Sequence, residues 1–182
     1  MIKDQKISSF LDDLSSKKPV PGGGSTSAVA GAMAASLVAM VANLTLGKEK
    51  YREVEEDFEQ VLPRATQLKD QLLQLADEDA LAYQAVVKTK SQEAIKTAAE
   101  VPLKVAQQSL EVLRLAVLAV KKGNQNALSD ARCAIELATA AIYGALENIR
   151  INLPYIEDKK FVCQLKSEIK KILTGAEEGV EK

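Results

Sequence analysis

The segment from Pro19 to Gly47 constrains the fold of this chain most strongly, because it contains no charged residue although 27% of the chain is charged. It opens with Pro19-Val20-Pro21, continues through consecutive glycines and hydroxyl residues, and then becomes rich in alanine. The prolines hold the approach extended, the glycines permit unusual backbone conformations, and Ser25 to Ser27 are good helix N-caps. We therefore predict a buried helix that begins near Ser25 and ends before Gly47.

The predicted helix is apolar nearly all round, with small residues recurring at steps of three and four. Such a helix lies at the centre of a bundle or crosses a membrane. Ser36, Asn43 and Thr45 interrupt the apolar run and no aromatic belt flanks it, which favours a bundle or a subunit interface over membrane insertion. A second small-residue stripe runs from Ala131 to Ala145. Two smooth helices of this kind are expected to pack closely on each other or on a second copy of the chain, and their apolar surface predicts a homodimer.

The remaining apolar residues recur at helical spacing, and no segment alternates with a period of two for long enough to form a strand. We predict one all-α domain over residues 1–182, a helical bundle around the charge-free helix. The first helix is expected to lie across the bundle as a cover. The expected helices are about 7–14, 25–46, 51–87 with a kink or break at Pro63, a short one from 89, 102–122, 131–153 and 161–172, before a frayed polar tail at 175–182.

Composition excludes several classes of chemistry. Lys+Arg 24 against Asp+Glu 25 leaves a net charge of −1, which gives no reason to expect a nucleic-acid partner. The chain has no histidine, which excludes Ser-His, Cys-His and His-metal catalysis. Cys133 and Cys163 are far apart in the sequence, so we expect neither a metal site nor any other cofactor. The polar first residues do not resemble a signal peptide, and we expect a cytoplasmic protein.

One carboxylate occupies a position where the helical pattern calls for an apolar residue. Asp79 continues the seam of Leu72 and Leu75, whereas Asp77 and Glu78 fall off the seam and are expected to be solvated. Burial would raise the pKa of Asp79 and suit it to proton transfer near neutral pH. The alternative is structural: Asp79 caps a neighbouring helix or pairs with a lysine.

Several motifs of this chain, taken together, resemble one known family. They are Pro19 to Ser25, the run Met40 to Lys48, the Asp77-Glu78-Asp79-Ala80 block with Tyr83, Val101 to Leu103, Gly123-Asn124, Ser129-Asp130, and Asn148 with Asn152-Leu153. This set resembles the cyclodeaminase/cyclohydrolase family, which includes the cyclodeaminase half of formiminotransferase-cyclodeaminase and stand-alone methenyltetrahydrofolate cyclohydrolases. The resemblance extends from about Phe10 to Pro154.

The resemblance implies an all-helical, dimer-forming enzyme that acts on tetrahydrofolate one-carbon adducts. It would either close 5-formiminotetrahydrofolate with loss of ammonia or add water to the carbon of 5,10-methenyltetrahydrofolate. Both reactions move a proton and pass through a charged, amidine-like centre, which a carboxylate stabilises. The other class left open is a non-catalytic or differently specific helical dimer that binds a folate-like ligand.

On this resemblance, two sets of residues are candidates for the site. Asp79 is the first candidate for acid–base or electrostatic catalysis and Asp130 the second. Bare N–H groups at a helix N-terminus bind anions and polar rings, so the glycine segment is expected to hold the pterin or the glutamate tail, although a capped turn would look the same. The expected substrate-binding residues are Pro21, Gly22, Gly23, Gly24, Ser25, Asn43, Tyr83, Asn124 and Asn126.

Overall fold

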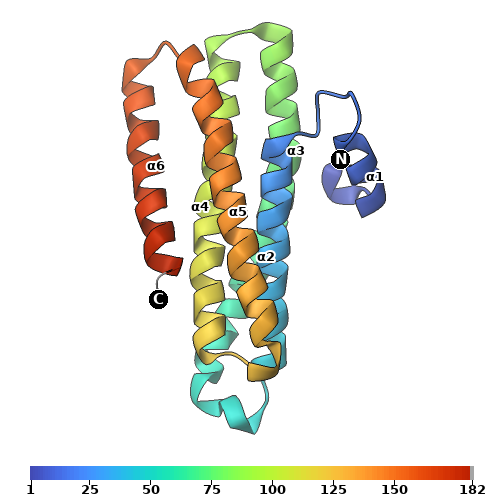
Figure 1. Cartoon of the computed structure of the whole chain (residues 1–182), viewed down its shortest axis with the longest axis vertical. Helices are drawn as coiled ribbons and strands as arrows, with labels where there is room; N and C mark the ends of the chain where they lie inside the picture. Colours follow the sequence, from blue (N-terminus) through green and yellow to red (C-terminus); the bar gives the residue numbers. More distant parts are fainter. Residues whose placement is uncertain (181–182) are drawn as a thin grey trace.

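The computed structural model describes residues 1–180, which form four long helices that run alternately up and down, with further helices beside them (Figure 1). The prediction of an all-α domain is confirmed, since the described residues contain no strand. The helices are α1 (Ile7–Leu14), α2 (Gly23–Thr45), α3 (Glu55–Thr89), α4 (Gln92–Lys122), α5 (Leu128–Asn152) and α6 (Lys159–Val180), with short 3-10 helices η1 (Ile2–Asp4), η2 (Glu49–Val54), η3 (Gln125–Ala127) and η4 (Leu153–Tyr155).

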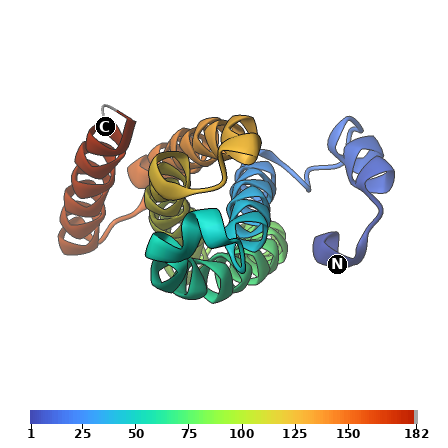
Figure 2. The same ribbon diagram turned by 90° about the horizontal axis from the view of Figure 1, so that it is seen from below.

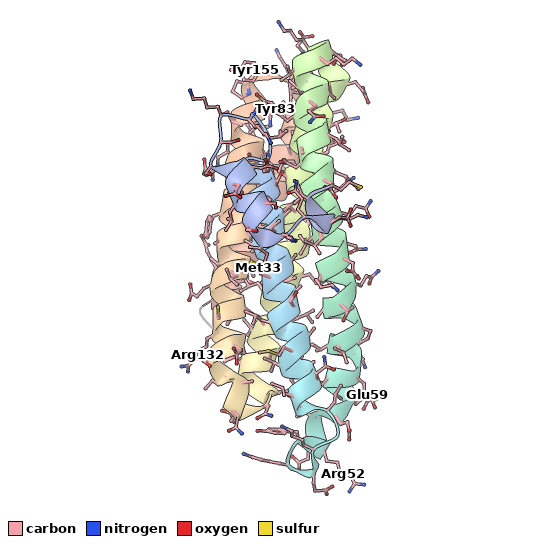
Figure 3. The ribbon with its side chains drawn as sticks, turned by 90° about the vertical axis from the view of Figure 1, so that its right-hand side faces the viewer. Met33, Arg52, Glu59, Tyr83, Arg132 and Tyr155 are labelled. Atoms are coloured by element: carbon pink, nitrogen blue, oxygen red, sulfur yellow. The ribbon has the colours of Figure 1, made fainter. Side chains whose placement is uncertain are left out.

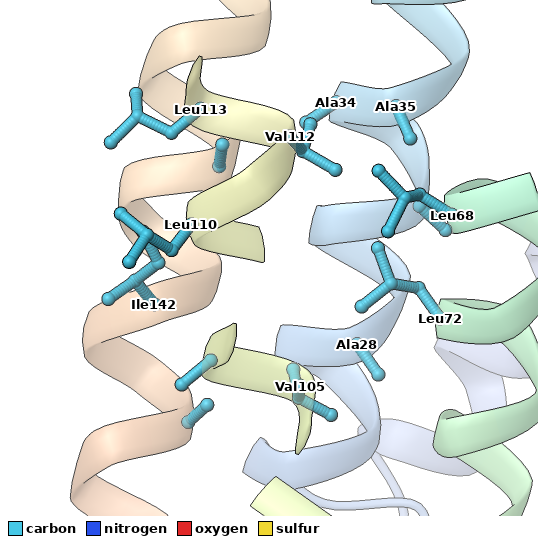
Figure 4. Close-up of a cluster of buried hydrophobic side chains, with 14 of the residues drawn as sticks. Ala28, Ala34, Ala35, Leu68, Leu72, Val105, Leu110, Val112, Leu113 and Ile142 are labelled. Atoms are coloured by element: carbon cyan, nitrogen blue, oxygen red, sulfur yellow. The ribbon is translucent and has the colours of Figure 1, made fainter. Parts of the chain in front are cut away.

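The charge-free helix α2 is the central element, because it packs against α3, α4 and α5. Its alanines lie against leucines and valines of its neighbours in a closely packed core (Figure 4). At Gly31 an added Cβ would lie 2.6 Å from Ser109 Oγ and 3.2 Å from Leu72 Cδ1. The small-residue stripe therefore has the role expected of it, which is to let neighbouring helices approach closely.

Helix α2 begins earlier than predicted and is capped differently. It starts at Gly23 with Gly22 as N-cap, and none of the hydroxyl residues caps it. The Thr26 hydroxyl donates to the Gly22 carbonyl and the Ser27 hydroxyl to the Gly23 carbonyl, so both bond to the preceding turn of the chain. The predicted stop is confirmed, because Gly47 lies just beyond the helix with a φ of +71°.

Two predicted divisions between helices do not occur. Helix α3 continues through Pro63 without dividing, and α4 runs through Pro102 as one helix. The short separate helix from residue 89 therefore does not exist: Ser91 caps α4 by accepting a hydrogen bond from the Ala94 N–H. The cost of a proline inside a helix is about 3 kcal/mol, which the packing of helices as long as these offsets.

The two ends of the chain also differ from expectation. Helix α1 does not cover the bundle but stands off to one side (Figure 2), with Ile7 78% and Leu11 52% exposed and only Phe10 buried. Residues 175–180 are not frayed, because they continue α6, and Ala176 is 1% exposed. Residues 181–182 of the predicted tail lie outside the described part of the chain.

Within the described residues, α2 is also the one helix long and apolar enough to cross a membrane by length and composition, and half of its most apolar window is buried inside the fold.

The close contact at Gly31 yields a stability prediction. Gly31→Ala should lower the free energy of unfolding by about 1–2 kcal/mol, because overpacking outweighs the better helix propensity of alanine. Ser109 Oγ is buried without a hydrogen-bond partner among the described residues, so Ser109→Ala alone should change stability little. Urea denaturation of both single variants and the double variant measures the effect. We expect the double variant to recover much of the loss; equal loss in Gly31→Ala with and without Ser109→Ala would contradict the packing account.

Candidate active site

A cleft of about 410 Å³ opens where α2 begins and α5 ends, on the upper part of the bundle. Tyr83 from α3 and Tyr155 from η4 are both exposed near this end, whereas Arg52 and Arg132 lie toward the other end (Figure 3). Among the lining residues Asp79 is the one charged side chain. The lining residues are Pro19, Val20, Gly22, Gly23, Gly24, Asp79, Tyr83, Val86, Ala98, Asn148, Ile151, Asn152 and Tyr155.

Asp79 reaches the first turn of α2 because Gly24 has no side chain. An added Cβ at Gly24 would lie 2.1 Å from Asp79 Oδ1 and 2.7 Å from Oδ2, so no other residue fits without displacing the carboxylate. The Ser25 hydroxyl donates to Asp79 Oδ2 at 2.8 Å. The carboxylate of α3 is therefore held against the start of α2, where the positive end of the helix dipole favours an anion.

The pKa of Asp79 is raised above its ordinary value of 3.8. Desolvation by burial is the largest cause, and hydrogen bonds from the Ser25 hydroxyl and backbone N–H act in the opposite direction. Among the described residues, Asp79 makes no salt bridge. Two structural roles were the alternatives for Asp79. Pairing with a lysine does not occur among these residues, whereas Asp79 does accept hydrogen bonds from Ser25 in the first turn of α2. These hydrogen bonds do not conflict with chemistry at the same carboxylate, since Asp79 also lines the cleft.

The glycine segment does not use the conformational freedom expected of it. Gly22 is extended, with φ −132°, and Gly23 and Gly24 are ordinary helical residues; Gly47 is the one glycine of the described chain with positive φ. Close approach is the reason for glycine instead. An added Cβ at Gly23 would lie 3.3 Å from Asn148 Nδ2, so Gly23 and Gly24 bring α2 against side chains of two different helices.

Two carboxamides on α5 complete the polar wall of the cleft. Asn148 donates from Nδ2 to the Gly144 carbonyl at 2.8 Å, and Asn152 donates from Nδ2 to the carbonyls of Asn148 and Ala98 at 2.8 and 3.2 Å. Both residues belong to a motif that carries the family resemblance, but neither was among the predicted site residues. Their spacing of one helical turn, on the same face of α5, is the signal that points to a shared task.

The prediction that Asp77 is solvated is wrong. It is 6% exposed, and its Oδ1 accepts a hydrogen bond from the Ile2 backbone N–H at 2.5 Å. The N-terminal η1 turn, which packs on α3, covers this carboxylate. Periodicity along α3 could not reveal this burial, because the covering residues come from a distant part of the sequence.

The remaining candidates lie away from the cleft. Asp130, in the first turn of α5, is 18 residues before Asn148, which corresponds to about 27 Å along a helix. Asn43 is exposed near the end of α2 that is far from Gly23. Pro21 lines a neighbouring hollow with Asp77, although the cleft includes the adjacent Gly22.

Asn124 and Asn126 also belong to the opposite end of the bundle, where Asn124 has a structural role. Its side chain donates to the Leu44 carbonyl at 2.6 Å and accepts from the Asn126 N–H at 3.0 Å, and its own N–H donates to Thr45 Oγ1. It therefore fastens the turn before α5 to the end of α2, in the manner of an asparagine turn. No group of three potential metal ligands occurs in the described part of the chain, and both cysteines are exposed and free.

Substitution at Gly24 tests how the cleft is built. Gly24→Ala should displace Asp79 and lower the melting temperature by several degrees, because its Cβ meets the carboxylate. Gly22→Ala is the matched comparison, because a Cβ there meets nothing closer than the Pro19 carbonyl at 4.0 Å. Thermal melts followed by circular dichroism check this, and a Gly24→Ala protein as stable as Gly22→Ala would show that Asp79 does not pack as described.

A single-domain helical bundle with one carboxylate, two carboxamides and backbone at a cleft between helix ends has the form of a small-molecule enzyme. A family model described as Formiminotransferase-cyclodeaminase matches residues 6–171. A methenyltetrahydrofolate cyclohydrolase from Methylorubrum extorquens is 38% identical, over 97% of this chain and 92% of that protein. The chain belongs to the formiminotransferase-cyclodeaminase family, as the resemblance predicted.

Two further relatives show how much of the family's architecture this chain represents. A formimidoyltransferase-cyclodeaminase from Gallus gallus is 26% identical over 95% of this chain, which spans about a third (35%) of that relative's length. The crystal structure of a formiminotetrahydrofolate cyclodeaminase from Thermotoga maritima matches with a TM-score of 0.96 and 30% identity, over 100% of this chain and 94% of that one.

Proposed function

We propose that this chain is a tetrahydrofolate one-carbon enzyme that hydrolyses 5,10-methenyltetrahydrofolate. The observation that carries this proposal is Asp79, the single charged side chain of the cleft, half-buried and without a cationic partner among the described residues. A lone carboxylate in such a cleft suits a substrate with a delocalised positive charge. The 38% identity to a cyclohydrolase over nearly the whole of both chains supports the choice of reaction.

In the proposed reaction Asp79 has two roles: its negative charge stabilises the cationic substrate, and its carboxylate accepts one proton and later returns it. The methenyl carbon bridges two nitrogens in a cationic amidinium, and the carboxylate stabilises that cation when it binds. As a water oxygen bonds to the carbon, Asp79 accepts a proton from the water, leaving a neutral hydroxylated intermediate. The bond from this carbon to one nitrogen then breaks, the nitrogen takes the proton back from Asp79, and the hydroxyl releases its own proton to become the formyl carbonyl. A raised pKa suits a group that accepts and returns a proton.

Cyclodeamination is the second candidate, supported by the structural match to a cyclodeaminase over the whole of this chain. It uses the same carbon: the second nitrogen of the folate bonds to the formimino carbon and ammonia leaves with a proton. Asp79 would deliver that proton, so one site geometry serves both reactions. Incubation of the purified protein with each adduct, followed by methenyltetrahydrofolate absorbance, distinguishes them: hydrolysis consumes the chromophore and cyclodeamination produces it.

The central prediction concerns Asp79→Asn, which keeps the size of the side chain and an acceptor for Ser25 but removes proton transfer. Turnover should fall by about 10²–10⁴-fold, as for loss of a general acid or base. In the unsubstituted protein, kcat/KM should fall with decreasing pH through a pKa above 3.8, and this acid limb should be absent in the variant. Asp70→Asn, at an exposed position on the same helix, is the control and should keep normal turnover.

Stability provides an independent readout of the same substitution. Because the folded-state pKa of Asp79 is raised, its protonated form stabilises the fold fully below pH 3.8, and that contribution is lost as pH rises through the folded-state pKa. Asp79→Asn should therefore be at least as stable as the unsubstituted protein at pH 7, and its advantage in stability should shrink as the pH approaches 3.8.

The turnover of the same variant decides the role of Asp79 in the reaction. An Asp79→Asn protein with normal turnover on both adducts would remove Asp79 from the mechanism.

We also propose that two copies associate through the outer face of α2. Met33, Met40 and Leu44 are 53%, 36% and 41% exposed on a helix without a single charge, which is an unusual surface for a monomer. Met33 and Met40 are seven residues apart and share one side of the helix. A second copy with the same strip would cover both.

Light scattering tests the dimer. The measured mass should be about twice the 19.6 kDa of one chain at micromolar concentration, and the double substitution Met33→Glu/Met40→Glu should reduce it to the mass of the monomer. Val87→Glu, at a position that is 59% exposed on α3 rather than on α2, is the matched control and should leave the dimer intact. A stable, folded monomer for the unsubstituted chain would contradict the proposal.

The proposed reaction requires no metal or organic cofactor, since the carboxylate supplies both the charge and the proton acceptor. A small-molecule folate is the proposed ligand, without nucleic-acid or membrane partners, and the proposed location is the cytoplasm. A chelator should leave turnover unchanged.

A further inference from the structure

The hydrogen bonds of Asn148 and Asn152 fix which way their carboxamides face. Each Nδ2 donates to a backbone carbonyl, so the amide orientation is set: reversing either amide would place an oxygen against a carbonyl oxygen. Asn152 uses both of its N–H groups, on the carbonyls of Ala98 and Asn148. Asn148 uses one of its two, on the carbonyl of Gly144.

What remains is an ordered set of free hydrogen-bonding groups. Among the hydrogen bonds of residues 1–180, neither carboxamide oxygen accepts one, and Asn148 retains one N–H. Both residues line the cleft, one helical turn apart on α5. Along the wall of the cleft, the protein thus presents a donor and an acceptor from Asn148, followed by an acceptor from Asn152.

We propose that this donor–acceptor–acceptor array recognises the pyrimidine edge of the pterin ring. In a 2-amino-4-oxopyrimidine, the carbonyl oxygen, the ring N–H and the exocyclic amino group follow one another as acceptor, donor and donor, which is the complementary order. Asn148 pairs with the carbonyl oxygen and the ring N–H, and Asn152 accepts from the amino group. This inference rests on the proposed function and names the part of the folate that sets specificity.

The glycine start of α2 relates this array to the reacting carbon. Gly23 lies against Asn148 of α5 and the adjacent Gly24 lies against Asp79 of α3, so one carboxamide and the carboxylate both approach the first turn of α2. A flat ring lying over these glycines contacts α5 at its pyrimidine edge and presents its one-carbon bridge to α3. A side chain at Gly23 would fill the space that the ring needs.

The test combines a substituted enzyme with a substituted substrate. The substrate is 5,10-methenyltetrahydrofolate, compared with its analogue in which hydrogen replaces the 2-amino group. The unsubstituted protein should lose about 10- to 100-fold in kcat/KM on the analogue, because a site built to bind an N–H group leaves its acceptor unpaired without it. Asn152→Ala should lose as much on the parent substrate and should then distinguish the two substrates by less than about threefold.

Asn148→Ala provides the internal comparison. It should lose activity on both substrates but keep the full discrimination for the amino group, since it reads the neighbouring atoms. Gln60→Ala, an exposed amide on α3, should behave as the unsubstituted protein. Should Asn152→Ala fold poorly, Asn152→Leu offers nearly the same volume, and the loss of discrimination is measured in the same way.

The outcomes separate this inference from the proposed function. An unsubstituted protein that turns over the methenyl substrate but treats the analogue equally would overturn the inference and leave the function standing. So would an Asn152→Ala protein that still discriminates fully, because a purely structural role for Asn152 lowers activity on both substrates by the same factor. A protein that converts neither folate adduct would overturn the proposed function and the inference together.

Discussion

The structure depends on how closely α2 approaches its neighbours, which only very small side chains permit. At Gly31 the neighbouring side chains leave no room for a methyl group. At Gly24 the Asp79 carboxylate occupies the space that a methyl group would need. The small residues that pack the core thus continue to the start of the helix, where Gly24 leaves room for the Asp79 carboxylate. Packing and chemistry follow from the same feature of the sequence, because a bulkier α2 would both separate the helices and push the carboxylate away from Ser25.

The contrast between Asp77 and Asp79 shows how local structure decides the role of a carboxylate. Both are on α3, separated by one residue; Asp77 is buried and Asp79 is half-buried. Asp77 is held by the backbone of the N-terminal turn, whereas Asp79 faces a cleft large enough for a ring system. The first therefore anchors the N-terminal turn, and the second lines the cleft in which we propose that the substrate binds.

The sequence predicts the elements of this fold better than their ends. The helical bundle could be predicted because its signals are local in the sequence. They are the uncharged run, the apolar periodicity of α3 and the glycines that end helices. The continuity of α3 across Pro63 and of α4 across Pro102 could not, since tertiary packing outweighs the local penalty. For the site, Asp79 and the glycines stand out within their own segments. Grouping Asn148 and Asn152 with them requires knowing that the end of α5 lies beside the start of α2. The same lack of three-dimensional information grouped Asp130 and Asn124 with these residues, although they lie at the other end of the bundle from the cleft.

The central claim is that folate binds at the end of the bundle where α2 begins. A crystal structure of the protein with a stable tetrahydrofolate analogue tests this most directly. The account predicts the ring over Gly23 and Gly24, with its one-carbon position beside Asp79 and its pyrimidine edge against Asn148 and Asn152. A folate bound instead at the opposite end, against Asn124 and Asp130, would contradict it.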